Sequence, residues 1–259
     1  MRPLPLFVLL LLLLLPQAQA ESLTLQEMQS AVAAEALTGE TQSAEAATSP
    51  AREAFIDAIL ATAKARFDEA DGRRMRAHKS GDIYVCKNFT VHLFRENRDG
   101  YRMAAYPDVP LVIPNNLPKA KSAPYAYGVR WEDIPAEQGN PFEIAAAFRY
   151  DSAMSKAENR ASARAFLQQV LRGDYFQMSA DYYYGVGAHS LVFIADYDPQ
   201  SDSVHWTDSN MKGETREGIR YGYVQYDAVQ KIDWFVDAIC HPKRGATLYR
   251  LRSDIVYAP

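Results

Sequence analysis

The chain has 259 residues, 48% hydrophobic and 23% charged, a balance that is typical of a globular protein and excludes collagen-like and largely disordered classes. Asp and Glu outnumber Lys and Arg by 32 to 28, and no basic stripe interleaved with aromatic residues is visible, so we expect no nucleic-acid partner. Two cysteines, Cys86 and Cys240, are too few for a disulfide-dense scaffold.

Residues 1–20 have the features of a secretory signal peptide. Arg2 precedes a nearly uninterrupted leucine run, which is followed by Pro16 and the small-residue sequence Ala18-Gln19-Ala20. The run is too short to span a bilayer, and no later apolar stretch reaches about 18 residues, so we expect no integral membrane segment after cleavage. The sequence therefore predicts a secreted or periplasmic protein with 239 residues after cleavage.

The segments after the leader predict a tail and then a helix. Residues 21–48 are rich in Ala, Glu, Gln and Ser and contain no aromatic residue, which predicts a flexible tail or a weak helix. Residues 49–78 predict a helical extension, because Ser49 suits the N-cap, Pro50 suits the first turn and apolar residues follow with the helical period. The main domain is predicted to cover residues 79–259.

Within the main domain, a helix is predicted to begin near Cys86. Residues 99–142 contain seven prolines and predict a long irregular excursion with short strands. A strong helix follows, with Ser155 and Glu158 in a capping box and Gly173 as its stop. Short strands rich in Val, Ile, Tyr and Phe are predicted at 175–179, 190–197, 203–207, 221–226 and 247–257. Helices followed by antiparallel strands predict an α+β fold.

Cys86 and His189 are the candidates for nucleophilic catalysis. The start of a helix favours a thiolate at Cys86, because unpaired backbone N–H groups and the helix dipole stabilise an anion there. The same donors can hold an oxyanion. Among five histidines, His189 has the best context for a base, because it follows a Gly-flanked segment and opens an apolar strand.

Hairpin geometry indicates which side chain orients His189. The turn at 198–202 joins the strand after His189 to the next strand, and pairing about this turn sets His189 opposite residue 208 or 210. Because strand side chains alternate with a period of two, both registers place His189 with Asp208 and Asn210, and His205 on the other face. Asp208, or otherwise Asn210, can accept the imidazole N–H as the third member of a triad.

A wider pattern surrounds these residues. Besides the Cys at a helix start and the His opening a strand, the chain has Leu171-Arg172-Gly173-Asp174-Tyr175-Phe176 leading into a strand and Asp208-Ser209-Asn210 closing the hairpin. In this succession, over roughly residues 79–226, the sequence resembles the CHAP group of papain-like peptidoglycan amidases and endopeptidases. The family usually has Glu where this chain has Asp208. The resemblance implies a papain-like fold, with N-terminal helices packed on an antiparallel β-sheet.

Three functions are open for this arrangement. The first, which the resemblance favours, is an exported cysteine hydrolase that cleaves amide bonds in the peptide part of peptidoglycan through a Cys-His-Asp triad and a thioester. The second is a non-catalytic envelope-binding domain with a Cys86–Cys240 disulfide, since the exported compartment is oxidising. The third is a cysteine acyltransferase or transglutaminase-like enzyme, because an amine captures a thioester where water is excluded.

Aromatic residues near these positions are candidates for substrate contact, since Tyr and Trp stack on sugar and peptide groups. They are Tyr84, Tyr182, Tyr183, Tyr184 and Trp206. A β-rich segment also buries tyrosine, and Trp206 equally suits a core. We expect no metal or organic cofactor, because His205, His241 and Cys240 show no recognised ligand spacing.

Overall fold

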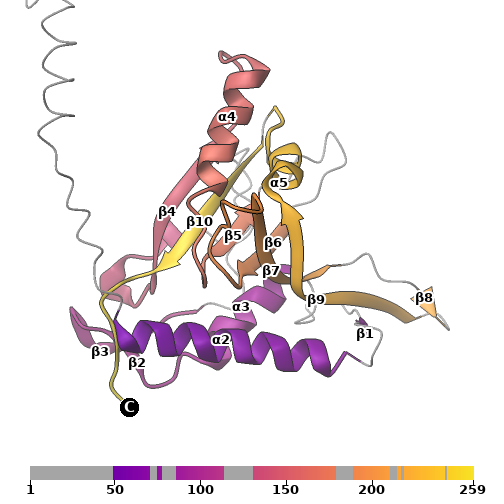
Figure 1. Ribbon diagram of the computed structural model, residues 1–259. Helices are drawn as coiled ribbons and strands as arrows, with labels where there is room; N and C mark the ends of the chain where they lie inside the picture. Colours follow the sequence, from indigo (N-terminus) through magenta and orange to yellow (C-terminus); the bar gives the residue numbers. More distant parts are fainter. Residues whose placement is uncertain are drawn as a thin grey trace, which may run out of the picture. The chain divides into compact units, whose positions relative to one another are not determined.

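The computed structural model describes residues 49–70, 75–77, 86–113, 131–178, 189–210, 215–216, 219–242 and 244–259. The expected leader and tail lie outside the described residues, as do four of the aromatic candidates, Tyr84, Tyr182, Tyr183 and Tyr184. Residues 47–259 form one compact unit. In its described part, four α-helices and two antiparallel sheets make a mixed α+β fold (Figure 1). Among the described residues, no helix has both the length and the apolar character needed to cross a membrane.

The larger sheet has eight strands in the order β1-β9-β7-β6-β5-β10-β4, with β8 paired to β9 beside this path. Its strands are β1 (Met75–Ala77), β4 (Phe142–Arg149), β5 (Tyr175–Met178), β6 (His189–Phe193), β7 (Ser203–Asn210), β8 (Thr215–Arg216), β9 (Ile219–Lys231) and β10 (Gly245–Leu251). The smaller sheet has the order β11-β2-β3 and consists of β2 (Tyr101–Met103), β3 (Tyr106–Pro110) and β11 (Ile255–Tyr257).

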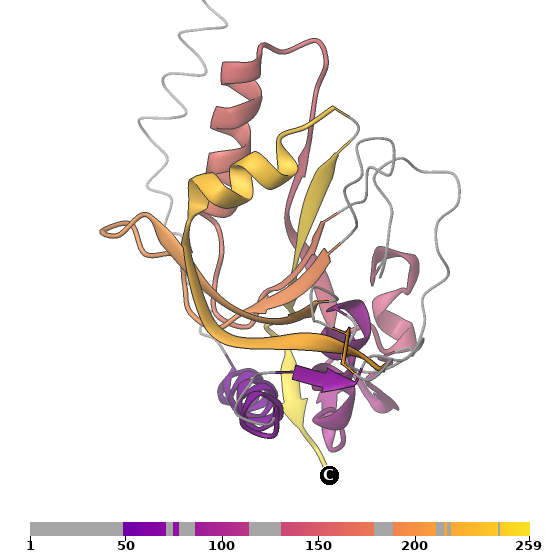
Figure 2. The ribbon, with the colours of Figure 1, turned by 90° about the vertical axis from the view of Figure 1, so that its right-hand side faces the viewer.

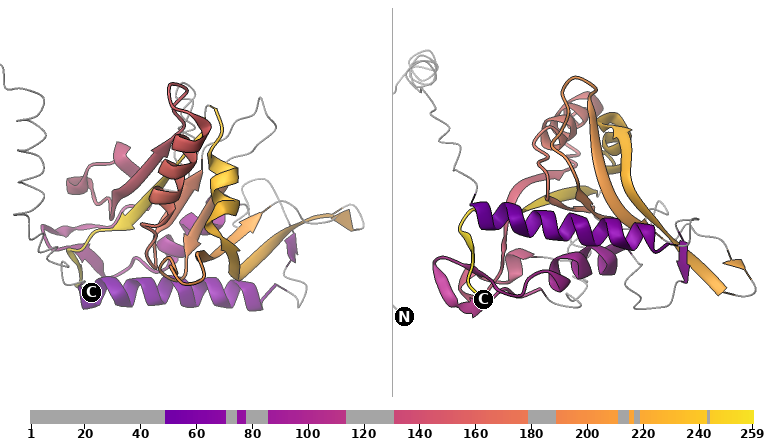
Figure 3. Two further views of the ribbon diagram at one scale, coloured as in Figure 1. Left: turned by 45° about the horizontal axis from the view of Figure 1, so that its top comes forward. Right: turned by 60° about the horizontal axis from the view of Figure 1, so that its bottom comes forward.

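Helices α2 (Pro50–Asp68) and α3 (Cys86–Glu96) cover one face of the larger sheet (Figures 1 and 2). Phe55 of α2 and Phe94 of α3 share a buried cluster with Tyr175 and Val192 from the sheet. The N-cap of α2 is Ser49, as predicted, but its hydroxyl makes no capping bond. It donates instead to the carbonyl of Ile255 at 2.6 Å, which ties the start of α2 to the end of the chain (Figure 3).

Helices α4 (Lys156–Leu167) and α5 (Ile232–Ile239) cover the opposite face. The predicted capping box of α4 is confirmed: the Ser155 N–H donates to Glu158 Oε2 at 2.7 Å, and the Glu158 N–H donates to Ser155 Oγ at 3.2 Å. The helix ends at Leu167, six residues before Gly173. Gly173 instead has a φ of 86° in the turn before β5, a conformation that glycine adopts without steric cost.

Three elements differ from the sequence expectation. Residues 75–77, expected in the helical extension, form β1 and pair with β9. No element was predicted at 143–149, and the Ala-rich segment forms β4 by pairing with β10. Helix α5 was not predicted. The sequence does contain a signal for α5, because four apolar residues recur at helical spacing. All four are buried in the structure: Ile232, Phe235, Val236 and Ile239.

Candidate active site

Helix α3 places Cys86 at its first residue and contacts β6 and β7. The Cys86 sulfur is hydrogen-bonded to the side chain of His189 and to the backbone N–H groups of Lys87 and Ser190. The Thr90 hydroxyl donates to the Cys86 carbonyl at 3.0 Å, so the first turn of α3 is fixed by a side chain as well as by the backbone. The sulfur therefore lies at the N-terminus of α3 and has three hydrogen-bond partners, an environment that stabilises an anion.

His189 is the first residue of β6, and its ring reaches the carboxylate of Asp208 on β7. His189 Nε2 and Asp208 Oδ2 are 2.5 Å apart. The ladder pairs Val192 with Thr207 and Phe193 with Trp206. Continued back to the start of β6, this register sets His189 opposite residue 210, which is one of the two predicted registers. Asp208 is then the diagonal neighbour of His189, within the reach of long side chains.

The hydrogen bonds assign the two ring nitrogens of His189. Since Nε2 bonds Asp208, Nδ1 is the nitrogen left for the Cys86 thiol. Asp208 also bonds a side chain that sequence reasoning did not identify: Gln225 of β9 donates from Nε2 to Asp208 Oδ1 at 2.8 Å. The structure therefore brings together a thiol from α3, an imidazole from β6 and a carboxylate from β7.

The electrostatics of the pair favour its ionised form. Burial raises the pKa of the Cys86 thiol, but the hydrogen bond and charge of His189 and the N–H donors outweigh burial, so this pKa lies below its ordinary value. Burial likewise lowers the pKa of His189, but Asp208 and Cys86 outweigh it and raise this pKa to about 10. At neutral pH these shifts favour a thiolate on Cys86 beside an imidazolium on His189.

A buried polar cluster supports the backbone of His189. Gln177 of β5 donates from Nε2 to the His189 carbonyl at 3.2 Å, and its Oε1 accepts from Ser190 Oγ at 2.6 Å and from the Tyr175 hydroxyl at 3.3 Å. Burial raises the pKa of Tyr175, so its hydroxyl keeps its proton and acts as a donor. The sequence signal for Gln177 is a single amide in an otherwise apolar strand segment, and in the structure this amide is buried.

The two cysteines are free, which corrects the expectation of a Cys86–Cys240 disulfide in the binding-domain alternative. Cys86 begins α3, whereas Cys240 follows α5 and packs with the cluster on the opposite face of the sheet. Burial raises the pKa of the Cys240 thiol. The two sulfurs therefore lie in different environments, and only Cys86 is bonded to an imidazole.

Asn210 and Trp206, two further predicted site residues, and His205, which was predicted on the other face, have other partners. Asn210 ends β7 and pairs with Tyr223 of β9. Trp206 is 5% exposed and stacks on Trp234 with ring centroids 6.0 Å apart, so its ring belongs to the core. His205 Nδ1 is 2.7 Å from Asp227 Oδ1 at the surface. Within the described ranges, no group of three or more His, Cys, Asp or Glu side chains is placed to bind a metal.

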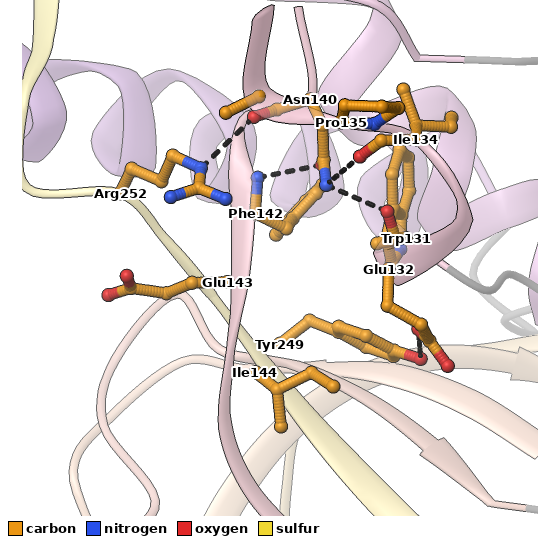
Figure 4. Close-up of a pocket in the computed structure, with 11 residues that line it drawn as sticks. Trp131, Glu132, Ile134, Pro135, Asn140, Phe142, Glu143, Ile144, Tyr249 and Arg252 are labelled. Carbon is orange, nitrogen blue, oxygen red and sulfur yellow. Dashed lines mark hydrogen bonds between the residues drawn. The ribbon is translucent and has the colours of Figure 1, made fainter.

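A pocket of about 330 Å³ lies between β4, β10 and the short helical turn at 131–133 (Figure 4). The Tyr249 hydroxyl donates to Glu132 Oε2 at 2.6 Å across it. Tyr249, Tyr175 and Val192 occupy neighbouring positions on β10, β5 and β6 and belong to one buried cluster. The pocket thus shares a sheet face with α3 but lies two strands away from β6.

Comparison with known proteins adds no assignment to these observations. No protein-family model, curated protein or solved structure matches the chain. The likeness to the CHAP group is therefore a resemblance in the motif residues, and the function must come from the geometry around Cys86, His189 and Asp208.

Proposed function

We propose that the protein is an exported cysteine hydrolase that cleaves amide bonds, with the peptide part of peptidoglycan as its substrate class. The observation that carries the proposal is the contact of Cys86 with His189 and of His189 with Asp208. These residues come from elements far apart in the sequence, and a nucleophile, a base and an orienting group within hydrogen-bond reach are the signature of nucleophilic catalysis. The signal-like leader and the resemblance to the CHAP group support the location and the substrate class.

The first half of the reaction forms a thioester. The Cys86 thiolate attacks the amide carbonyl carbon, and the C=O electron pair moves onto oxygen. Backbone N–H groups at the start of α3 lie beside the sulfur and supply donors for this oxyanion. His189 then donates its proton to the amide nitrogen, the C–N bond breaks and the amine leaves. Cys86 is now a thioester, and the imidazole is neutral.

The second half restores the enzyme. Neutral His189 accepts a proton from water, and the resulting hydroxide attacks the thioester carbonyl. The C–S bond breaks, the acid product leaves, and the thiolate and imidazolium are formed again. Asp208 keeps the ring oriented in both halves through its bond to Nε2, so that Nδ1 faces first the leaving nitrogen and then the water.

The papain-like arrangement belongs to the same proposal. A helix that carries Cys86 at its first residue packs against a sheet that carries His189 at the start of a strand, and the acidic residue follows on the next strand. This chain order of Cys, His and acid is the order that the resemblance implies.

The test is hydrolysis of purified sacculi by Cys86→Ala, with Cys240→Ala as the matched control. We expect Cys86→Ala to lose more than about 1000-fold in rate while its thermal unfolding temperature is kept, because alanine has no nucleophilic atom to form the thioester. Cys240→Ala should keep its rate within about twofold, since Cys240 packs with the cluster on the opposite face of the sheet from α3. Full activity of Cys86→Ala would reject the assignment. Product masses with and without a primary amine then separate hydrolysis from acyl transfer.

A further inference from the structure

We infer that Gln225 is a positioning residue of the active site: it holds the carboxylate of Asp208 so that the other oxygen meets His189. This inference rests on the proposed function and adds to it a fourth residue. It assigns Gln225 no contact with substrate, because its amide acts through Asp208.

The contacts of Asp208 account for both of its oxygens. Oδ2 lies 2.5 Å from His189 Nε2, and Oδ1 accepts from Gln225 Nε2 at 2.8 Å. The Asp208 side chain is 3% exposed, so solvent does not replace either partner. A buried carboxylate is stable only with its acceptor sites bonded. With one donor on each side, the carboxylate plane cannot turn without breaking one of the two bonds.

A β-bulge brings Gln225 onto the face of Asp208. Trp206 pairs with Ala228, but two residues later Asp208 pairs with Gln225, so β9 contains one extra residue. Asp227, with a φ of 54°, lies inside this irregularity. In a regular ladder residue 208 would pair with residue 226, and the side chain of Gln225 would point to the other face. β9 also curves along its length (Figure 2), and bulged strands bend in this way.

The backbone around Gln225 is also fixed. The hydroxyl of Thr207, which is fully buried, donates to the Gln225 carbonyl at 2.8 Å. Thr207 immediately precedes Asp208 in β7, so the same two strand segments are joined once through the backbone of Gln225 and once through its side chain.

The chemistry of an amide suits this position better than a cation would. A Lys or Arg beside Asp208 would compete with the imidazolium for its negative charge, whereas an amide N–H donates without carrying charge. Gln225 therefore fixes the direction of the carboxylate and leaves its charge available to the His189 imidazolium.

The experiment measures the Cys86 thiolate directly, so it needs no substrate. In a Cys240→Ala background, the alkylation rate of Cys86 by iodoacetamide is followed against pH. We expect both Gln225→Leu and Asp208→Asn to move the midpoint of this titration to higher pH. A loosened or neutral side chain at 208 stabilises the imidazolium less, and the imidazolium then stabilises the thiolate less. Gln230→Leu, which changes an exposed glutamine of the same strand, should leave the midpoint unchanged.

Two further measurements separate positioning from general structural support. Gln225→Leu should lower kcat roughly tenfold, the effect of one hydrogen bond to a charged group, with KM changed less than about twofold. In an Asp208→Asn background the same change should add nothing, because Gln225 acts through Asp208. Gln225→Met keeps the length of the side chain but has no N–H donor and no charge, so it is the second variant in case Gln225→Leu unfolds, and it should also move the midpoint upward.

A midpoint that stays in place in both Gln225 variants while Asp208→Asn moves it would overturn this inference and leave the Cys-His-Asp assignment intact. A different result would reject the proposed function itself: Cys86→Ala would keep its hydrolytic activity, whatever the thiolate titration shows.

Discussion

Two histidine–aspartate pairs each include a residue of β7 in the larger sheet, and they differ in what surrounds them. His189 and Asp208 are 2.5 Å apart, and the carboxylate is 3% exposed. His205 and Asp227 are 2.7 Å apart, and the carboxylate is 57% exposed. The first ring bonds the acid through Nε2 and has Cys86 on its other side, whereas the second bonds through Nδ1 at the surface.

The comparison shows that a histidine–aspartate hydrogen bond does not by itself mark a site. An exposed pair contributes at most about 1 kcal/mol, because water competes for both partners. A buried carboxylate is costly to desolvate and remains charged only if other groups bond it, and Asp208 has His189 and Gln225. Burial of the acid and a thiol beside the ring are therefore the features that separate the first pair from the second.

Removing each histidine in turn should give the largest difference between the two pairs. We expect His189→Ala to lower kcat/KM for amide hydrolysis by more than about 1000-fold, because Cys86 loses both its base and its counter-ion. His205→Ala should change it by less than about twofold, since its pair is exposed and contacts no thiol. Rates on purified sacculi, with thermal unfolding of each variant, check the two expectations.

His189→Gln serves as a second variant, because its amide can still donate to Asp208 and guard against unfolding. Similar losses on changing His189 and His205 would show that the two pairs are equivalent and that burial does not distinguish them.

Local patterns in the sequence pointed to Cys86, His189 and Asp208, and the structure brings these three side chains together. Cys86 was placed by a helix start, His189 by the strand it opens, and Asp208 by the period of two along a hairpin. Each of these predictions depends only on residues that are close in the sequence or joined by the single hairpin turn at 198–202. The helix at Pro50–Asp68 and the capping box at Ser155 and Glu158 were predicted for the same reason.

Features that depend on distant partners could not be read in this way. The side chain of Gln225 lies on the face of Asp208 because of the bulge near Asp227. No sequence pattern predicts the position at which the register of two paired strands shifts. The strand Phe142–Arg149 has an Ala-rich sequence and is formed by pairing with β10. The pocket at Tyr249 combines several segments, which become neighbours only in the folded sheet.

The two thiols also differ in their surroundings, because the Cys86 thiol is hydrogen-bonded to His189. Its pKa is lowered, whereas burial raises the pKa of Cys240. At pH 7 we therefore expect iodoacetamide to alkylate Cys86 more than about ten times faster than Cys240. Peptide mapping by mass spectrometry measures both rates in one sample, and equal rates would contradict the ion pair.

The same shifts set the pH dependence of hydrolysis. The pKa of Cys86 is lowered, so the thiolate is present above that lowered value and is lost as the pH falls through it. The pKa of His189 is raised to about 10, so the imidazolium is present below that pH and is lost above it. kcat/KM should therefore be level through neutral pH and fall on both sides. A rate that only rises towards the pKa of an ordinary thiol would contradict this.

Asp227 also contributes through its backbone, which lies in the bulge of β9. Its φ of 54° lies in the left-handed region, which glycine adopts freely and a β-branched residue does not. Asp227→Gly should therefore keep the free energy of unfolding within about 0.5 kcal/mol, whereas Asp227→Val should lower it by about 1–2 kcal/mol. Urea unfolding measures both free energies.

Because the bulge aligns Gln225 with Asp208, Asp227→Val should also slow hydrolysis several-fold, and Asp227→Gly should not. Both variants lose the bond to His205, so equal losses in the two would assign the effect to that bond instead of to the backbone.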